Sequence, residues 1–314
     1  MGTERKIKSL IQKRPGIFVT DPAYQMASCR HAPEMSEIIW EVKRAMARGI
    51  DPEVCDHGAT ETYLLKGEDG TPLAIFKLEN YLPELAAYRL DHKRFAKVPP
   101  TALTTLSHPI WKGEKTGSCQ FYLSEGVSAS NYMWDECQKL EAPPIRKIAA
   151  LDIRILNEDR HTSNILILNK KEAIPIDHGF CLKEELGFLH LHWVFWEQSE
   201  TSWDERELSY LLWLDPEGDR RLLLDELHFP EGSANRVYIA TQFLKEGALR
   251  GASPIQIGRC FIANTPNGEE QTPFQLLIER LYQKEAPSWP HLTCHIHDEI
   301  QQFWDGRQKE DFAF

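Results

Sequence analysis

The sequence has no long apolar run, no excess of positive charge and no paired-cysteine motif. No stretch approaches the roughly 20 apolar residues of a membrane-spanning helix, and residues 1–16 lack the apolar core of a signal peptide. The formal net charge is −11, with 36 Lys and Arg against 47 Asp and Glu. This balance argues against a nucleic-acid binder and against overall attraction to an anionic membrane surface.

Cysteine is scarce and scattered. The seven cysteines are odd in number and form no C-x-x-C pair, so neither a disulfide framework nor a zinc site is predicted. Cys294, His295 and His297 lie close together, but no second cluster accompanies them, so we do not interpret them as a metal site. A reducing, cytoplasmic location is the expectation that follows.

The two halves of the chain differ in pattern. Apolar residues at helical spacing alternate with short aromatic and aliphatic strands up to residue 126. In this half, helices are predicted at 33–49 and 83–95, and strands at 59–66, 71–78, 102–106 and 118–126. A long helix then begins at Pro143 and runs to residue 160. Further helices are predicted at 204–213, 216–227, 233–250, 272–284 and 294–304.

This order predicts an α+β protein with two lobes. Residues 1–32 are expected to be irregular, residues 33–126 to form a β-rich N-terminal lobe, and residues 127–314 to form a mostly helical C-terminal lobe. Polar residues gather at the junction of the two halves, and such junctions are where ligand clefts form.

A polar window lies at residues 157–179, which read NEDRHTSNILILNKKEAIPIDHG. Its apolar stretches predict a hairpin that brings Asn164 and Asp177 to the same end. Amide and carboxylate oxygens are the ligands that Mg²⁺ prefers. Asp159 stands five residues before Asn164, the interval found in the protein-kinase catalytic loop H-R-D-L-x-x-x-N. The window therefore predicts a magnesium site beside a carboxylate that positions an acceptor hydroxyl.

The basic and acidic partners that ATP transfer needs lie upstream. Lys77 ends the strand AIFK, as the lysine of V-A-I-K does, and is assigned to the ATP phosphates. Glu84, on the next helix, is assigned to hold Lys77 in place. Arg160 or His161 is expected to steady the transferring phosphate.

The D-R-H order, the following asparagine and the segment IPIDHG resemble the phosphatidylinositol 3- and 4-kinase catalytic family, and most of all the plant gamma-type phosphatidylinositol 4-kinases. The resemblance extends over most of the chain. It implies a bilobal protein-kinase-like fold, ATP with Mg²⁺ or alternatively Mn²⁺, a catalytic Asp159, and metal binding by Asn164 and Asp177. It also implies that backbone groups of Phe121, Tyr122 and Leu123 meet adenine.

Two features depart from this family. The phosphate loop is poor in glycine and offers Gly58 with Thr60 and Thr62, so hydroxyls and backbone N–H groups are expected to cover the phosphates. The ubiquitin-like domains of many plant relatives are not expected in these 314 residues, which should hold the kinase domain and little else.

The acceptor is left open between a protein Ser or Thr and phosphatidylinositol. The loop after Gly179 carries Lys183 against six acidic residues up to residue 205, which slightly favours a protein acceptor. Trp193, Phe195 and Trp196 are interpreted as core, with peripheral contact to a membrane as the alternative. A catalytically weak pseudokinase that binds nucleotide or a partner is the other class considered.

Overall fold

The computed structural model describes residues 32–55, 61–263, 271–283 and 288–306, so the irregular segment predicted at 1–32 lies almost wholly outside the described residues. The chain divides into two compact units. The first holds the described residues up to Arg89 together with Pro99–Ser124, and the second holds Leu90–Val98 and the described residues from Glu125 onward. The α+β class, with a β-rich N-terminal part and a helical C-terminal part, is confirmed.

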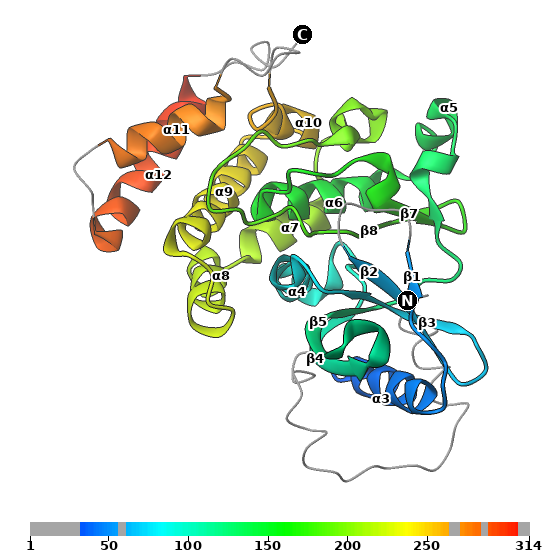
Figure 1. Ribbon diagram of the computed structural model, residues 1–314. Helices are drawn as coiled ribbons and strands as arrows, with labels where there is room; N and C mark the ends of the chain where they lie inside the picture. Colours follow the sequence, from blue (N-terminus) through cyan, green and yellow to red (C-terminus); the bar gives the residue numbers. More distant parts are fainter. Residues whose placement is uncertain (1–31, 56–60, 264–270, 284–287, 307–314) are drawn as a thin grey trace. The chain divides into compact units, whose positions relative to one another are not determined.

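The first unit is built on an antiparallel sheet with strand order β1-β2-β3-β5-β4 (Figure 1). Its strands are β1 (Glu53–Val54), β2 (Thr62–Lys66), β3 (Pro72–Lys77), β4 (Thr101–His108) and β5 (Gly113–Phe121). Helix α3 (Glu34–Ala47) packs against this sheet, α4 (Tyr81–Leu90) follows β3, and the short helix η3 (Pro109–Trp111) joins β4 to β5. The antiparallel pair of β2 and β3 matches the hairpin predicted at 59–66 and 71–78.

The core of this unit gathers around Trp111. The rings of Tyr63 and Phe76 lie 5.2 and 5.4 Å from it, and all three side chains are buried. Gly117 of β5 lies so close to β3 that an added Cβ would stand 2.2 Å from the backbone oxygen of Lys77. Only glycine allows this approach, so Gly117 sets the position of the end of β3.

The second unit contains a small sheet of order β6-β7-β8 and most of the helices. The strands are β6 (Val127–Ser128), β7 (Ile165–Leu168) and β8 (Glu172–Pro175). The α-helices are α5 (Trp134–Cys137), α6 (Ala142–Ile155), α7 (Glu205–Trp213), α8 (Pro216–Arg221), α9 (Glu231–Leu249), α10 (Pro254–Gly258), α11 (Pro273–Tyr282) and α12 (Trp289–Asp305). Shorter helical turns are η2 (His92–Arg94), η4 (Ala129–Asn131), η5 (Thr162–Asn164), η6 (His192–Phe195), η7 (Glu197–Ser199) and the π-turn η8 (Leu222–Glu226).

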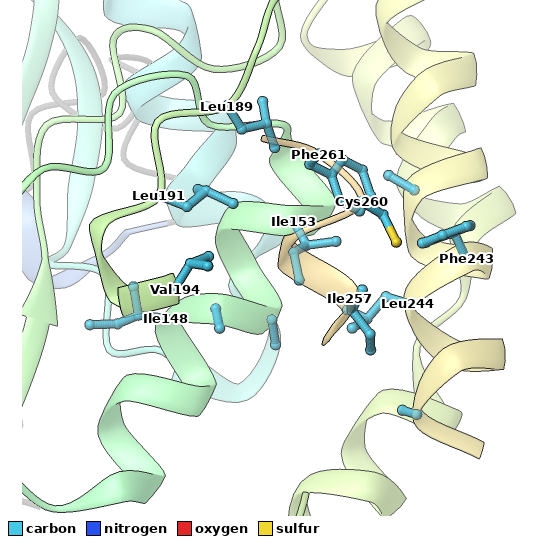
Figure 2. Packing of buried hydrophobic residues seen from close by; sticks show 14 of the residues in the cluster. Ile148, Ile153, Leu189, Leu191, Val194, Phe243, Leu244, Ile257, Cys260 and Phe261 are labelled. Atoms are coloured by element: carbon cyan, nitrogen blue, oxygen red, sulfur yellow. The ribbon is translucent and has the colours of Figure 1, made fainter. Parts of the chain in front are cut away.

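Helix α6 lies in the middle of this unit and contacts α9, α10, β8 and η7. Figure 2 shows its Ile148 close to Val194 and its Ile153 close to Phe261, which follows α10. Pro143 and Pro144 suit the first turn of α6. The helix ends at Ile155, five residues before the predicted end, and is followed by Leu156, which adopts a left-handed conformation with φ 52°. The polar window begins directly after this residue.

The structure departs from the expected elements at a few places. The helix predicted at 216–227 is α8 followed by a π-turn, and the short elements β6, α5 and α10 were not predicted. Trp193 and Trp196 are fully buried, as the core interpretation requires, whereas Phe195 is 64% exposed. Among the residues that the structure describes, every helix is too short or too polar to cross a bilayer.

Candidate active site

The β7–β8 hairpin brings the two ends of the polar window together. Its register pairs Ile165 with Pro175 and Leu168 with Glu172. One residue further out, the backbone N–H of Ile176 donates to the carbonyl oxygen of Asn164 at 3.0 Å. Asn164 and the residue after Ile176, Asp177, therefore lie at the same end of the hairpin. Asp177 adopts φ 54°, in the left-handed region.

The side chain of Asn164 holds the Asp159 segment beside this hairpin end. Its Nδ2 donates to the carbonyl oxygen of Asp159 at 2.8 Å and lies 3.4 Å from the carboxylate oxygen Oδ2. The N–H of Asp159 in turn donates to Oδ1 of Asn157 at 3.0 Å. Asp159 keeps 35% of its side chain exposed, so a solvent-borne hydroxyl can reach its carboxylate.

The donor set suits a magnesium ion that is shared with phosphate. Because Nδ2 of Asn164 is engaged with Asp159, its Oδ1 is the amide atom left to face a cation. Together with the carboxylate of Asp177 it could supply two oxygen ligands, and Mg²⁺ commonly takes one or two protein oxygens along with phosphate oxygens and water. Within the described ranges, no group of three or more His, Cys, Asp or Glu side chains could hold a metal ion.

His161 lies beside the carboxylate of Asp159. Its Nε2 is 3.3 Å from Oδ1 of Asp159, its Nδ1 contacts Oγ of Ser163, and 38% of the side chain is exposed. The ring of His192 lies 6.4 Å from that of His161. Burial lowers the pKa of His192, and the neighbouring His161 and His190 lower it further. The imidazole of His161 therefore lies beside the position of a group that is hydrogen-bonded to Asp159.

Arg160 lies elsewhere than expected, because its side chain is fully buried. Its Nε is 3.1 and 3.0 Å from the two carboxylate oxygens of Asp152. Its Nη1 donates to the carbonyl oxygens of Asn164 and Ile176, at 2.5 and 2.6 Å. A guanidinium engaged in this way is not directed at a phosphate, so of the two expected candidates the exposed His161 is the one that can approach it.

In the first unit, Lys77 and Glu84 form a buried ion pair. The Nζ of Lys77 is 2.6 Å from Oε1 of Glu84, and the two side chains are 11% and 2% exposed. Lys77 ends β3 and Glu84 lies in the first turn of α4, so a single short connection joins the two partners. The glycine at position 117 permits the strand packing that places Lys77.

The residues expected to contact nucleotide are described only in part. Gly58 and Thr60 lie outside the described residues, whereas Thr62 pairs with Lys77 across β2 and β3. At the end of β5, the N–H of Phe121 donates to the carbonyl of Pro100 at 2.8 Å.

The next two residues of the expected adenine segment differ in their backbone contacts. The N–H of Tyr122 donates to the carbonyl of Leu73 at 3.0 Å. Of the three N–H groups in this segment, that of Leu123 is the one with no backbone acceptor in the described part of the chain.

Sequence reasoning missed three residues that shape the site. Asp152 and Asn157 support the Asp159 segment, and Gly117 positions the end of β3. Asp152 carried a signal: it interrupts the apolar helix IAALDIRIL, and a buried carboxylate requires partners. Gly117 had no signal, because its role depends on a neighbouring strand.

A buried Lys–Glu pair in a β-rich unit and an Asp–Asn–Asp arrangement on a hairpin in a helical unit define a kinase-like phosphotransferase domain. The sequence pattern of the family described as phosphatidylinositol 3- and 4-kinase matches residues 78–257, which is more than half of the chain. The chain belongs to this family, as its D-R-H and D-H-G motifs predicted.

Named plant proteins extend the similarity beyond that segment. The chain is 30% identical over 286 residues to phosphatidylinositol 4-kinase gamma 5 of Arabidopsis thaliana, covering 74% of this chain and 45% of the relative. It is also 30% identical over 308 residues to phosphatidylinositol 4-kinase gamma 1 of the same plant, covering 82% and 54%. The chain thus spans about half the length of the curated relatives it matches.

Proposed function

We propose that the chain transfers the γ-phosphate of ATP to a hydroxyl acceptor. The observation that carries this proposal is the contact of Asn164 with Asp159, at 2.8 Å, on the same hairpin end as Asp177. The three side chains combine a carboxylate for the acceptor with oxygen ligands for a divalent cation. Such positioning and charge neutralisation account for most of the catalysis of phosphoryl transfer.

Each candidate site residue of the second unit has a proposed role. Asn164 and Asp177 hold Mg²⁺, or alternatively Mn²⁺, which neutralises phosphate charge when it is bound with ATP. Asp159 accepts the hydrogen bond of the acceptor hydroxyl and orients it. His161, 3.3 Å from Asp159, faces the transferring phosphate.

Two groups of residues in the first unit are assigned to nucleotide in this proposal. Lys77, held by Glu84, binds the α- and β-phosphates, and the phosphate loop with Gly58, Thr60 and Thr62 covers them. The N–H of Leu123, which no backbone carbonyl of the described residues accepts, is assigned to adenine, with Phe121 and Tyr122 beside it.

For the acceptor, the charge of the loop after Gly179 favours a protein Ser or Thr near basic residues. Lys183 is the basic residue of this loop, and it pairs with the carboxylate of Glu158. The next two residues, Glu184 and Glu185, are exposed. An acidic loop attracts a basic peptide and repels an anionic head group.

Phosphatidylinositol is the second candidate acceptor, because it appears in the names of the relatives. Its single phosphodiester requires less positive charge than a polyphosphorylated lipid. The exposed Phe195 offers an apolar contact with a membrane surface for this candidate. In either case we propose a cytoplasmic location, because the cysteines of the sequence are scattered and form no paired motif.

A two-phase labelling experiment tests the proposal. The protein is incubated with γ-labelled ATP, Mg²⁺, basic Ser/Thr peptides and phosphatidylinositol vesicles, and lipid and protein are then extracted separately. Label in the protein phase supports the peptide acceptor, and label in lipid alone refutes it. The control is Asp159→Ala: if the wild type and this variant transfer equally little label, the chain is a pseudokinase and the proposed reaction is wrong.

A further inference from the structure

We infer that Arg160 and Asp152 form a buried positioning pair that sets the metal-binding end of the hairpin, and that neither residue touches substrate. This inference rests on the proposed function, since it concerns the residues assigned to Mg²⁺. It gives Arg160 a role in the reaction that differs from direct contact with phosphate.

The guanidinium of Arg160 joins the two strands at the point where the proposed ligands begin. One nitrogen, Nη1, donates both to the carbonyl oxygen of Asn164 and to that of Ile176. Asn164 is itself a proposed ligand, and Ile176 directly precedes the other, Asp177. Two short hydrogen bonds from one nitrogen therefore fix the separation of the two ligand-bearing backbones.

Asp152 anchors this guanidinium from α6. Both of its carboxylate oxygens contact Nε of Arg160, and the two side chains are 0% exposed. Oδ1 also accepts from Nδ2 of Asn157 at 3.0 Å, and Oδ2 accepts from the indole N–H of Trp193 at 3.0 Å. Trp193 is held in turn by Gly258, where an added Cβ would lie 2.7 Å from the indole ring.

These hydrogen bonds connect α6 to the backbone that bears the proposed metal ligands. Asn157, which donates to Asp152, also accepts from the N–H of Asp159, so the same carboxylate supports the proposed base. Residues that orient metal ligands from behind typically change metal affinity or activity by about 10- to 100-fold when they are replaced. A pair that served stability alone would leave the requirement for metal unchanged.

The decisive comparison is between Arg160→Lys and Arg154→Lys. Both arginines are buried and each pairs with a buried carboxylate. Arg160 pairs with Asp152 of α6, and Arg154, which lies in α6, pairs with Asp219 at 2.7 Å. Lysine keeps the charge in each case but cannot reach a carboxylate and two carbonyls together. We expect Arg160→Lys to raise the Mg²⁺ concentration needed for half-maximal phosphate transfer by about 10- to 100-fold, and Arg154→Lys to leave it unchanged. An unchanged requirement in Arg160→Lys, or an equal rise in both variants, overturns the inference.

A second measurement needs no activity. In the ligand-free protein, the backbone N–H of Ile176 donates a hydrogen bond to the carbonyl oxygen of Asn164. The rate at which this amide exchanges with deuterium therefore measures how well the end of the hairpin is held together. We expect faster exchange at Ile176 in Arg160→Lys but not in Arg154→Lys. If the wild type transfers no phosphate, the proposed function fails, whereas this exchange rate still decides whether Arg160 positions the hairpin.

A milder variant covers the case in which Arg160→Lys does not fold. Trp193→Phe removes the indole donor to Asp152 and leaves both charges in place. It should raise exchange at Ile176 to a smaller extent. Exchange at the wild-type rate would show that Asp152 does not carry the hairpin geometry.

Discussion

The ion pair of Lys77 and Glu84 makes stability and activity separable by mutation. Lys77→Met removes the ammonium group and leaves the carboxylate of Glu84, which is 1% exposed as a residue, buried without that partner. Breaking a buried pair in this way costs about 3–5 kcal/mol. The double variant Lys77→Met/Glu84→Gln removes both charges and should return the free energy of unfolding close to the wild-type value, because neutral replacement of a buried pair costs little.

Urea unfolding and labelled-ATP transfer are measured on the wild type, the single variants Lys77→Met and Glu84→Gln, and the double variant. The two substitutions should couple by at least about 3 kcal/mol, and phosphate transfer should be lost in every variant that lacks the lysine. Lys66→Met is the matched control on the same sheet. Its partner Glu53 is 57% exposed, so we expect a cost of only about 0–1 kcal/mol. Additive costs of the two single substitutions, or activity that returns with stability in the double variant, would refute the reasoning.

Three further outcomes are expected. Gly117→Ala places a Cβ 2.2 Å from the backbone oxygen of Lys77, so it should cost about 1–3 kcal/mol in urea unfolding and reduce ATP turnover; full wild-type stability would contradict the close approach. Burial raises the pKa of Asp219, but Arg154 and His92 together outweigh the effect of burial and hold the pKa below its usual value. Because a lowered pKa adds stability that is lost as pH falls through the folded value, the deficit of Asp219→Asn should be large at neutral pH and shrink in acid; a deficit independent of pH would count against this. Asp159→Asn should lower the rate of phosphate transfer by about 10²- to 10⁴-fold with unchanged circular dichroism, and a smaller loss would argue against its role as base.

Much of the fold could be predicted because local patterns and packing agree. The short apolar runs of β7 and β8 define their hairpin, and the two ends of that hairpin follow from the register alone. The long helix α6 was visible from its prolines and its apolar spacing. The assignment of Leu90–Val98 to the second unit was not visible, because it depends on distant partners: the carbonyl of Leu90 accepts from Arg154, and Phe95 stacks on Tyr210.

The site was predictable in its residues more than in their contacts. Motif spacing pointed to Asp159, Asn164 and Asp177 as candidates, because phosphate transfer with a divalent cation needs oxygen donors for the cation and for the acceptor hydroxyl. The burial of Arg160 could not be read from spacing, since an arginine beside a catalytic aspartate equally suits a phosphate contact. The burial of Arg160 depends on its ion pair with Asp152, which lies on another element, α6.

The central claim is that Asn164 and Asp177 hold a divalent cation together with ATP. The most direct test is the binding of Mn²⁺, followed by electron paramagnetic resonance, in the presence of a non-hydrolysable ATP analogue. The wild type should bind Mn²⁺ in a nucleotide-dependent manner, and Asp177→Asn should lose most of this binding while it remains folded. Equal binding by the two proteins, or no nucleotide-dependent binding by the wild type, would contradict the account.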